Sequence, residues 1–230
     1  MSDTCAIPTA NAPADKDDTS FDSGPGKHVM YFGDPMCSWC WGFAPELSRI
    51  ADAIKGRAQL HIIMGGLRPG TRDPWDQEMR DYIRHHWEDV AAKTGQPFDY
   101  ARFDEISFVY DTEPPCRALI TVRSLKPGAT LAMYEALQRG FYAEGLNLSD
   151  ATTLEGLAQH CGVDPAAFAE TFAAPGTRAL TVADFHRSRA FGVTGFPSLV
   201  CAEDGQYAVL SLGYRTFASM QAILDEWLNA

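Results

Sequence analysis

Cys37 and Cys40 are the residues of this 230-residue sequence best suited to chemistry, and they lie in the string DPMCSWCW at positions 34–41. Two cysteines at this spacing either exchange with a disulfide or supply two ligands to zinc. Zinc normally requires a second pair of sulfur or imidazole ligands, and the adjacent His160 and Cys161 are poorly spaced to form one. The pattern therefore favours a redox-active dithiol, and we expect no metal.

The surrounding sequence indicates how the pair is positioned. The apolar run at 28–32 (HVMYF), ended by Gly-Asp-Pro, predicts a buried strand, and apolar residues at helical spacing predict a helix over 38–55. Cys37 then lies at the first turn of that helix, where free backbone N–H groups and the helix dipole favour a thiolate. The thiolate attacks disulfides, and Cys40, one turn further on, is placed to resolve the mixed disulfide.

Other elements complete an α/β architecture. A second strand at 59–64 makes a βαβ unit, so the first two strands should be parallel. The middle of the chain shows no convincing strand, and its helices are predicted at 75–94, 116–125, 130–143, 153–161 and from Asp164 as N-cap onward. A connecting helix at 177–191, a hairpin with strands at 197–201 and 207–212, and a closing helix from Thr216 follow.

This order predicts a small mixed sheet with helices on both faces, interrupted after its second strand. We assign residues 28–67 and 177–230 to the sheet domain and residues 68–176 to an all-helical insertion. Residues 1–27 are rich in aspartate and proline, a composition typical of a disordered tail.

A second motif lies far along the chain at 193–200 (VTGFPSLV), where Pro197 begins a strand and demands a special backbone arrangement. A strand, the Cys-x-x-Cys pair, a helix with Pro45 five residues after the second cysteine, and the late GVTGFP segment resemble a thioredoxin-fold oxidoreductase. With the helical insertion, the chain resembles the DsbA superfamily, and most closely its FrnE-like branch of cytosolic thiol-disulfide oxidoreductases and isomerases. The strings DPMCSWCWGFAP, GGLRPG and DTEPPCRA also fit that branch, and the resemblance covers roughly residues 28–229.

The resemblance implies roles for individual residues. Cys37 matches the nucleophile, Cys40 the resolving thiol and Pro197 the cis-proline whose loop lies against the active-site sulfurs, while the backbone of Phe196 pairs with an extended substrate. Trp39, between the cysteines, is a candidate apolar contact for peptide substrates. The implied partners are protein or peptide thiols and disulfides together with a cellular thiol reductant or oxidant. Beyond the redox-active disulfide no cofactor is implied, and glutathione is a candidate co-substrate.

Composition excludes other classes of function. With 30 acidic and 19 basic side chains the net charge is −11, which would repel the phosphate backbone of nucleic acids. No apolar stretch approaches the roughly 20 residues that a membrane helix needs. The first 27 residues have neither the basic start nor the apolar run of a signal peptide. We therefore expect a cytoplasmic protein that binds neither nucleic acid nor membrane.

Two alternative functions stay open at this point. One is a glutathione-dependent isomerase or transferase of the kappa-class and hydroxychromene-carboxylate isomerase group, which characteristically has serine at the position of Cys37 and does not need Cys40. The other is a non-enzymatic holdase or metal-binding thioredoxin-like module.

Several other residues have competing interpretations. We expect Cys116, Cys161 and Cys201 to be small buried residues, with Cys116 a candidate extra redox thiol. Asp34 is interpreted as a turn residue, with proton acceptor for Cys40 as the alternative. Arg68 is a candidate anion ligand, for example for a glutathione carboxylate. The pair His85 and His86 is expected on the solvated face of its helix.

Overall fold

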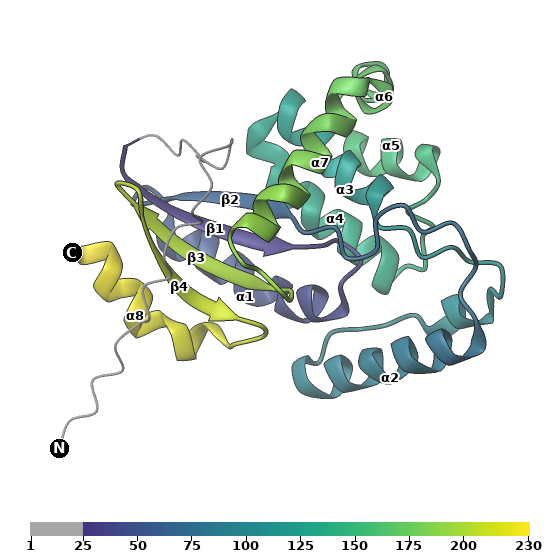
Figure 1. Ribbon diagram of the computed structural model, residues 1–230, viewed down its shortest axis with the longest axis horizontal. Coiled ribbons are helices and arrows are strands. Elements are labelled where there is room, and N and C mark those ends of the chain that lie inside the picture. The colour runs from purple at the N-terminus through teal and green to yellow at the C-terminus, as the bar shows by residue number, and fades with distance from the viewer. Residues whose placement is uncertain (1–24) are drawn as a thin grey trace.

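A four-stranded mixed sheet organises the computed structural model, which describes residues 25–230. Its strands lie in the order β2-β1-β3-β4, with bounds β1 (Lys27–Gly33), β2 (Gln59–Met64), β3 (Ser198–Glu203) and β4 (Gln206–Leu212). β1 pairs with β2 in parallel, and β1–β3 and β3–β4 are antiparallel pairs (Figure 1). Most of the predicted N-terminal tail, residues 1–24, lies outside the described residues.

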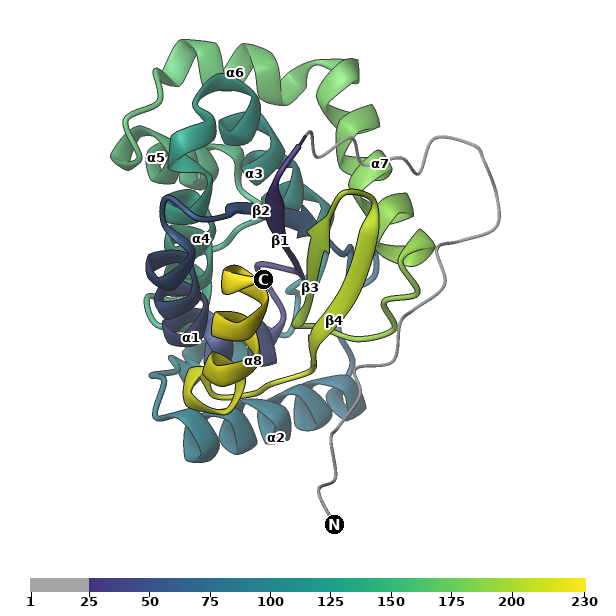
Figure 2. The same ribbon diagram turned by 90° about the vertical axis from the view of Figure 1, so that its left-hand side faces the viewer.

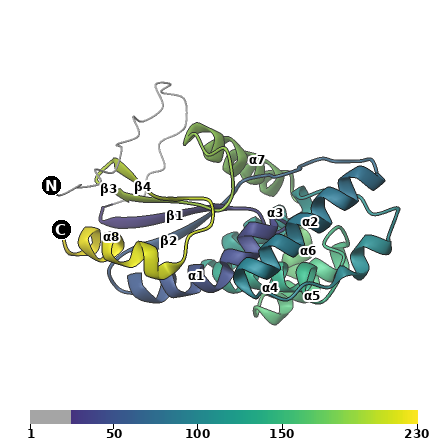
Figure 3. The ribbon, with the colours of Figure 1, turned by 90° about the horizontal axis from the view of Figure 1, so that it is seen from below.

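Helices cover both faces of the sheet. α1 (Ser38–Ile54) and α8 (Phe217–Asn229) lie on one side, and α7 (Pro175–Ala190) lies on the other (Figures 2 and 3). Alternate residues of β1 belong to the two sides, as the two-residue period of a strand requires. Tyr31 belongs to the hydrophobic cluster formed with residues of α1, and its ring stacks on Phe43 with the ring centroids 5.9 Å apart. Phe32 belongs to a second cluster, and its ring centroid lies 5.4 Å from that of Phe191.

A helical insertion separates β2 from α7. Its bounds are α2 (Gln77–Thr94), the 3₁₀ helix η1 (Tyr100–Asp104), α3 (Glu113–Leu125), the 3₁₀ helix η2 (Pro127–Ala129), α4 (Thr130–Tyr142), α5 (Ala151–His160) and α6 (Pro165–Ala173). The structure describes every residue between β2 and β3, and no strand occurs among them. The predicted fold class, a mixed sheet interrupted by a helical insertion, is therefore confirmed. Within residues 25–230, no helix combines the length and apolar character needed to cross a membrane.

Local sequence signals explain where these helices begin and end. The side chain of Asp76 accepts from the N–H of Met79 at 2.8 Å and caps α2, which stops at Gly95 in the left-handed region. The predicted N-cap Asp164 accepts from Ala167 at 2.9 Å. α3 starts at Glu113, three residues before the predicted position, because the two prolines that follow fit the first turn of a helix. The 3₁₀ helices were not predicted.

Asp184 of α7 ties the insertion to the sheet. Its carboxylate accepts from the Met64 N–H at 3.0 Å and from two guanidinium nitrogens of Arg123 at 2.9 and 3.0 Å. Arg123 of α3 also donates to the Ile62 carbonyl of β2 at 2.9 Å. Because Asp184 is only 1% exposed, these hydrogen bonds compensate a buried charge and fix α3 and α7 against the end of β2.

Two histidines of the adjacent strands β1 and β2 form a pH-sensitive contact. His28 Nδ1 lies 3.0 Å from His61 Nε2, and His28 is fully buried. Burial, followed by the charges of His28, Arg123 and Arg187, lowers the pKa of His61 from 6.5 to about 4. The folded chain therefore binds this proton less tightly than the unfolded chain, and stability falls as pH decreases from 6.5 to about 4.

We predict that His61→Gln removes this loss of stability. The free energy of unfolding, measured by urea denaturation between pH 7.5 and pH 4, should fall less steeply with acidification in His61→Gln than in the wild type. The exposed His186→Gln should keep the wild-type slope. Parallel slopes for the wild type and His61→Gln would contradict the assignment.

Candidate active site

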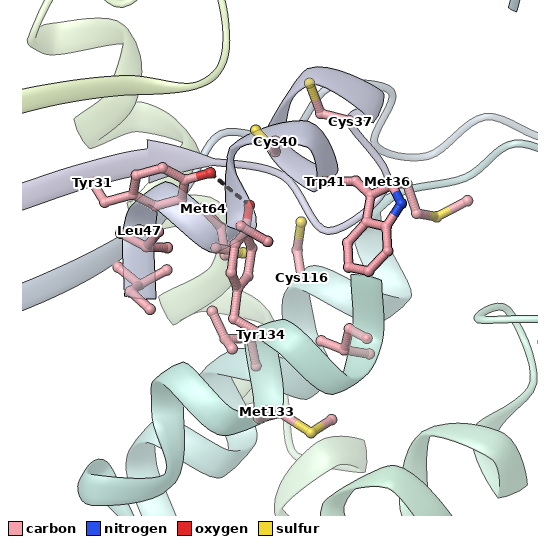
Figure 4. Packing of buried hydrophobic residues seen from close by; sticks show 14 of the residues in the cluster. Tyr31, Met36, Cys37, Cys40, Trp41, Leu47, Met64, Cys116, Met133 and Tyr134 are labelled. Carbon is pink, nitrogen blue, oxygen red and sulfur yellow. Dashed lines mark hydrogen bonds between the residues drawn. The ribbon is translucent and has the colours of Figure 1, made fainter. Parts of the chain in front are cut away.

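The two cysteines lie at the junction of β1 and α1. Cys37 is the N-cap of α1 with extended backbone angles, and its carbonyl accepts the N–H of Trp41 at 3.0 Å. Cys37 is 8% exposed and Cys40 is fully buried. Figure 4 shows both side chains at the start of α1. The predicted position at the helix start is confirmed, and Cys37 is the more exposed of the two cysteines.

The loop before β3 faces this turn. The Phe196–Pro197 peptide bond is cis, the form that the family resemblance implied. Cys37 Sγ lies 3.7 Å from the Phe196 carbonyl oxygen, within hydrogen-bonding range for a thiol. The fold thus brings together two motifs separated by 159 residues in the sequence.

Two glycines in the loop after β2 provide space for phenylalanine rings. A Cβ at Gly65 would lie 2.0 Å from the tip of the Phe196 ring, so no larger residue fits there. Gly66 adopts φ +67°, and a Cβ on it would lie 2.8 Å from the ring of Phe185. Gly65 of the GGLRPG string therefore leaves room for the Phe196 ring, and Gly66 leaves room for the Phe185 ring.

Asp34 connects the turn to its neighbours. Its carboxylate accepts from the N–H of Met36 at 2.9 Å and of Leu67 at 2.8 Å, and the thiol of Cys116 donates to it at 3.5 Å. The bond to Met36 is the one that a turn aspartate makes, so that interpretation is correct but incomplete. Burial raises the pKa of the Asp34 carboxyl, against the hydrogen bonds from Leu67 and Met36.

Two tyrosines form the floor beneath Cys40. The hydroxyls of Tyr31 and Tyr134 lie 3.2 Å apart, and Tyr134 also donates to the Asp34 carbonyl at 3.3 Å (Figure 4). Burial raises the pKa of both hydroxyls well above the usual value of a tyrosine, so both stay protonated. They are therefore hydrogen-bond donors on the buried side of the dithiol.

The two thiols titrate as a pair. The hydrogen bond between them, followed by burial, holds the pKa of Cys37 well above its usual range, although the Cys40 amide acts in the opposite direction. Burial alone would raise the pKa of Cys40, but hydrogen bonds from Cys37 and Tyr31 lower it. In the reduced pair the two thiols thus share one proton-binding environment, and the hydrogen bond between them shifts the two pKa values in opposite directions.

A cavity of about 270 Å³ opens beside Cys37. It is bounded by the start of α1, the loop after β2, α2, and the loop before β3, and its lining residues include Trp39, Arg68, Tyr82, His86, Tyr110 and Phe196. Two of the residues predicted to contact substrate, Trp39 and Phe196, therefore line the same cavity as Cys37. The prediction for His86 was wrong, since it is half-buried and lines this cavity.

The remaining described cysteines differ in burial. Cys116 and Cys201 are buried as expected, whereas Cys161 is half-buried. Burial raises the pKa of Cys116 well above the usual thiol value, and the charge of Asp34 adds to this shift. A larger cavity of about 580 Å³ runs along β2 and contains no cysteine among its lining residues. Within residues 25–230, no three His, Cys, Asp or Glu side chains group as metal ligands.

A Cys-x-x-Cys pair at a helix start, a cis-proline loop against its first sulfur and an inserted helical region define a DsbA-like thioredoxin fold. The chain belongs to the DSBA-like thioredoxin domain family, which it matches over residues 28–223. This membership places the chain in the DsbA-like family of thiol-disulfide oxidoreductases.

Solved structures with the same fold refine this placement. A structure described as a "putative protein disulfide isomerase" from Nitrosomonas europaea is 34% identical, with a TM-score of 0.84 over 89% of this chain and 98% of that chain. Cytosolic disulfide reductase DsbM from Pseudomonas aeruginosa is 29% identical, with a TM-score of 0.73 over 88% of this chain and 98% of that one. DsbM has also been solved with GSH. A curated relative, ClpXP adapter protein SpxH from Halalkalibacterium halodurans, is 21% identical over 94% of this chain and 72% of its own length.

We predict that Asp34→Asn changes how stability depends on pH. Because burial raises the pKa of Asp34 above 3.8, the folded state holds this proton more tightly, and its contribution to stability is lost as pH rises through the raised pKa. The wild type should therefore lose stability relative to Asp34→Asn between pH 4 and pH 7 in urea denaturation. The exposed Asp73→Asn should show no such trend, and a constant difference between the wild type and Asp34→Asn would count against the assignment.

Proposed function

We propose that this protein is a thiol-disulfide oxidoreductase and isomerase that acts on protein or peptide disulfides through a mixed disulfide on Cys37. The observation that carries the proposal is the position of Cys37, slightly exposed at the N-cap of α1 and 3.7 Å from the Phe196 carbonyl beside cis-Pro197. Cys40 lies behind it, fully buried and hydrogen-bonded to it.

The proposed reaction proceeds in two exchanges. The Cys37 thiolate attacks one sulfur of a substrate disulfide, the substrate S–S bond breaks, and the leaving sulfur takes a proton as a thiol. Cys40 then attacks Cys37 Sγ, which releases the second substrate thiol and leaves a Cys37–Cys40 disulfide. The substrate has gained two electrons, and a cellular thiol must return two electrons to the protein. In isomerisation, a second substrate thiol attacks the mixed disulfide before Cys40 does.

Substrate binding is assigned to the groups around the sulfur. The backbone of Phe196 offers its carbonyl at the position where an extended peptide would lie, and main-chain pairing of this kind is independent of the peptide sequence. Trp39 lines the cavity and packs against Tyr214 at 5.9 Å, so its ring is held beside the thiol. Both contacts suit unfolded chains of varied sequence.

The relatives support a reducing or isomerising role in the cytoplasm. DsbM is described as a cytosolic disulfide reductase, and the cytosol keeps most thiols reduced. For this chain we propose the same compartment, with residues 28–67 and 177–230 as the catalytic thioredoxin-like domain and residues 68–176 as the helical insertion that completes the cavity. The glutathione-dependent transferase alternative needs no second thiol, and Cys40 therefore separates the two functions.

We predict that serine substitution of either active-site cysteine abolishes turnover. In dithiothreitol-driven insulin reduction, Cys37→Ser and Cys40→Ser should fall to the uncatalysed rate, while Cys161→Ser should retain the wild-type rate. Mass spectrometry of Cys40→Ser mixed with a disulfide peptide should show an adduct on Cys37, because the resolving thiol is missing. Full activity of Cys37→Ser would refute the mechanism, and full activity of Cys40→Ser would favour the transferase.

A further inference from the structure

The cavity beside Cys37 differs in charge from the rest of the molecule. The chain carries a net charge of −11, yet none of the described residues that line this cavity is Asp or Glu. Its charged lining residue is Arg68, and His86 adds a group able to carry positive charge. The reactive sulfur is therefore approached through a pocket that favours an anion.

Arg68 has no acidic partner within the part of the chain that the structure describes. Each of the buried arginines Arg102 and Arg117 pairs with a glutamate, at 2.6 and 2.7 Å respectively. Arg68 instead contacts Met79 Sδ at 3.7 Å and the face of Tyr110 at 5.7 Å from the ring centroid. A half-buried guanidinium with only soft contacts keeps its capacity for a bidentate carboxylate.

The backbone holds this guanidinium in place. The N–H of Arg68 donates to Thr112 Oγ1 at 3.0 Å, and its carbonyl accepts the N–H of Thr112 at 3.3 Å. The loop after β2 is therefore fixed to the segment before α3. The same loop carries Gly65, which lies directly against the Phe196 ring. The loop therefore fixes the position of Arg68 relative to the Phe196–Pro197 loop.

We propose that Arg68 binds the carboxylate of a small anionic thiol of the glutathione class, and so selects the thiol that reduces the Cys37–Cys40 disulfide. This inference rests on the proposed function and adds the chemical class of the reductant and the residue that recognises it. A cavity of about 270 Å³ suits a small molecule, and the relative DsbM has been solved with GSH.

The reduction balances with two molecules of the thiol. The first thiolate attacks Cys37 Sγ, the Cys37–Cys40 bond breaks, and Cys40 leaves as a thiolate and takes up a proton. The second thiolate attacks the sulfur of the bound tripeptide, which releases glutathione disulfide and the Cys37 thiolate. Two glutathione molecules thus give two electrons to the protein, and Arg68 acts only in binding the carboxylate.

The first test uses the wild-type protein with its disulfide oxidised. Stopped-flow rates of reduction are compared for glutathione, glutathione diethyl ester and dithiothreitol, each corrected for its thiolate fraction. Losing a charge-assisted hydrogen bond should make the ester slower than glutathione by about tenfold or more. Equal rates for glutathione and its ester would overturn the proposal.

The second test uses variants. Arg68→Gln should slow the reaction with glutathione by about tenfold while leaving dithiothreitol and the ester at wild-type rates, because only the carboxylate contact is lost. Arg68→Lys, which keeps the charge, should restore part of the rate. Arg72→Gln, in the same loop and exposed, should match the wild type.

Three results would count against the assignment of Arg68, and a fourth would count against the proposed function, so the two are distinguishable. If Arg68→Gln keeps the wild-type rate with glutathione, or if Arg72→Gln slows as much, Arg68 does not recognise the carboxylate. If Arg68→Gln slows equally with all three thiols, its role is structural. If dithiothreitol fails to reduce a Cys37–Cys40 disulfide in the wild type, the proposed function itself is wrong.

Discussion

The rest of the site depends on the hydrogen bonds that the buried carboxylate of Asp34 accepts. It lies without solvent exposure between the turn that carries the cysteines, the loop after β2 and α3, and it accepts from a group in each. The backbone carbonyl of Asp34 accepts hydrogen bonds from the N–H of Cys37 and from the hydroxyl of Tyr134. A charge in this position is tolerated only when hydrogen bonds replace water, so folding of the turn and docking of the helices are coupled.

The helical insertion supplies part of the site. Tyr134 of α4 reaches the hydroxyl of Tyr31 in β1, and Tyr110 donates its hydroxyl to the Met36 carbonyl in the cysteine turn. Arg123 of α3 binds Asp184 of α7 and the edge of β2, which holds the insertion in register with the sheet. The insertion therefore closes one wall of the thiol cavity.

Much of this architecture is predictable from local patterns. The bounds of β2 match the prediction. β1 is one residue longer than predicted at each end, and α1 ends one residue earlier than predicted. The agreement is close because apolar runs and glycine stops mark these elements clearly. Cys37 was placed by its motif. Tyr31 was not identified as a site residue, because in HVMYF it resembles core packing and its partner Tyr134 lies 103 residues away. The position of His86 in the cavity depends on how α2 packs against the rest of the chain, and the hydrophobic periodicity of the sequence does not predict that packing.

The central claim, that Cys37 and Cys40 form the redox couple, is tested most directly by an equilibrium redox titration. The protein is equilibrated in buffers of graded glutathione to glutathione disulfide ratio, its free thiols are alkylated, and each cysteine is quantified by peptide mass mapping. We expect Cys37 and Cys40 to lose their labels together in one two-electron transition, while Cys116, Cys161 and Cys201 stay labelled throughout. Independent oxidation of Cys37 and Cys40, or a disulfide that joins either of them to Cys116, would contradict the account.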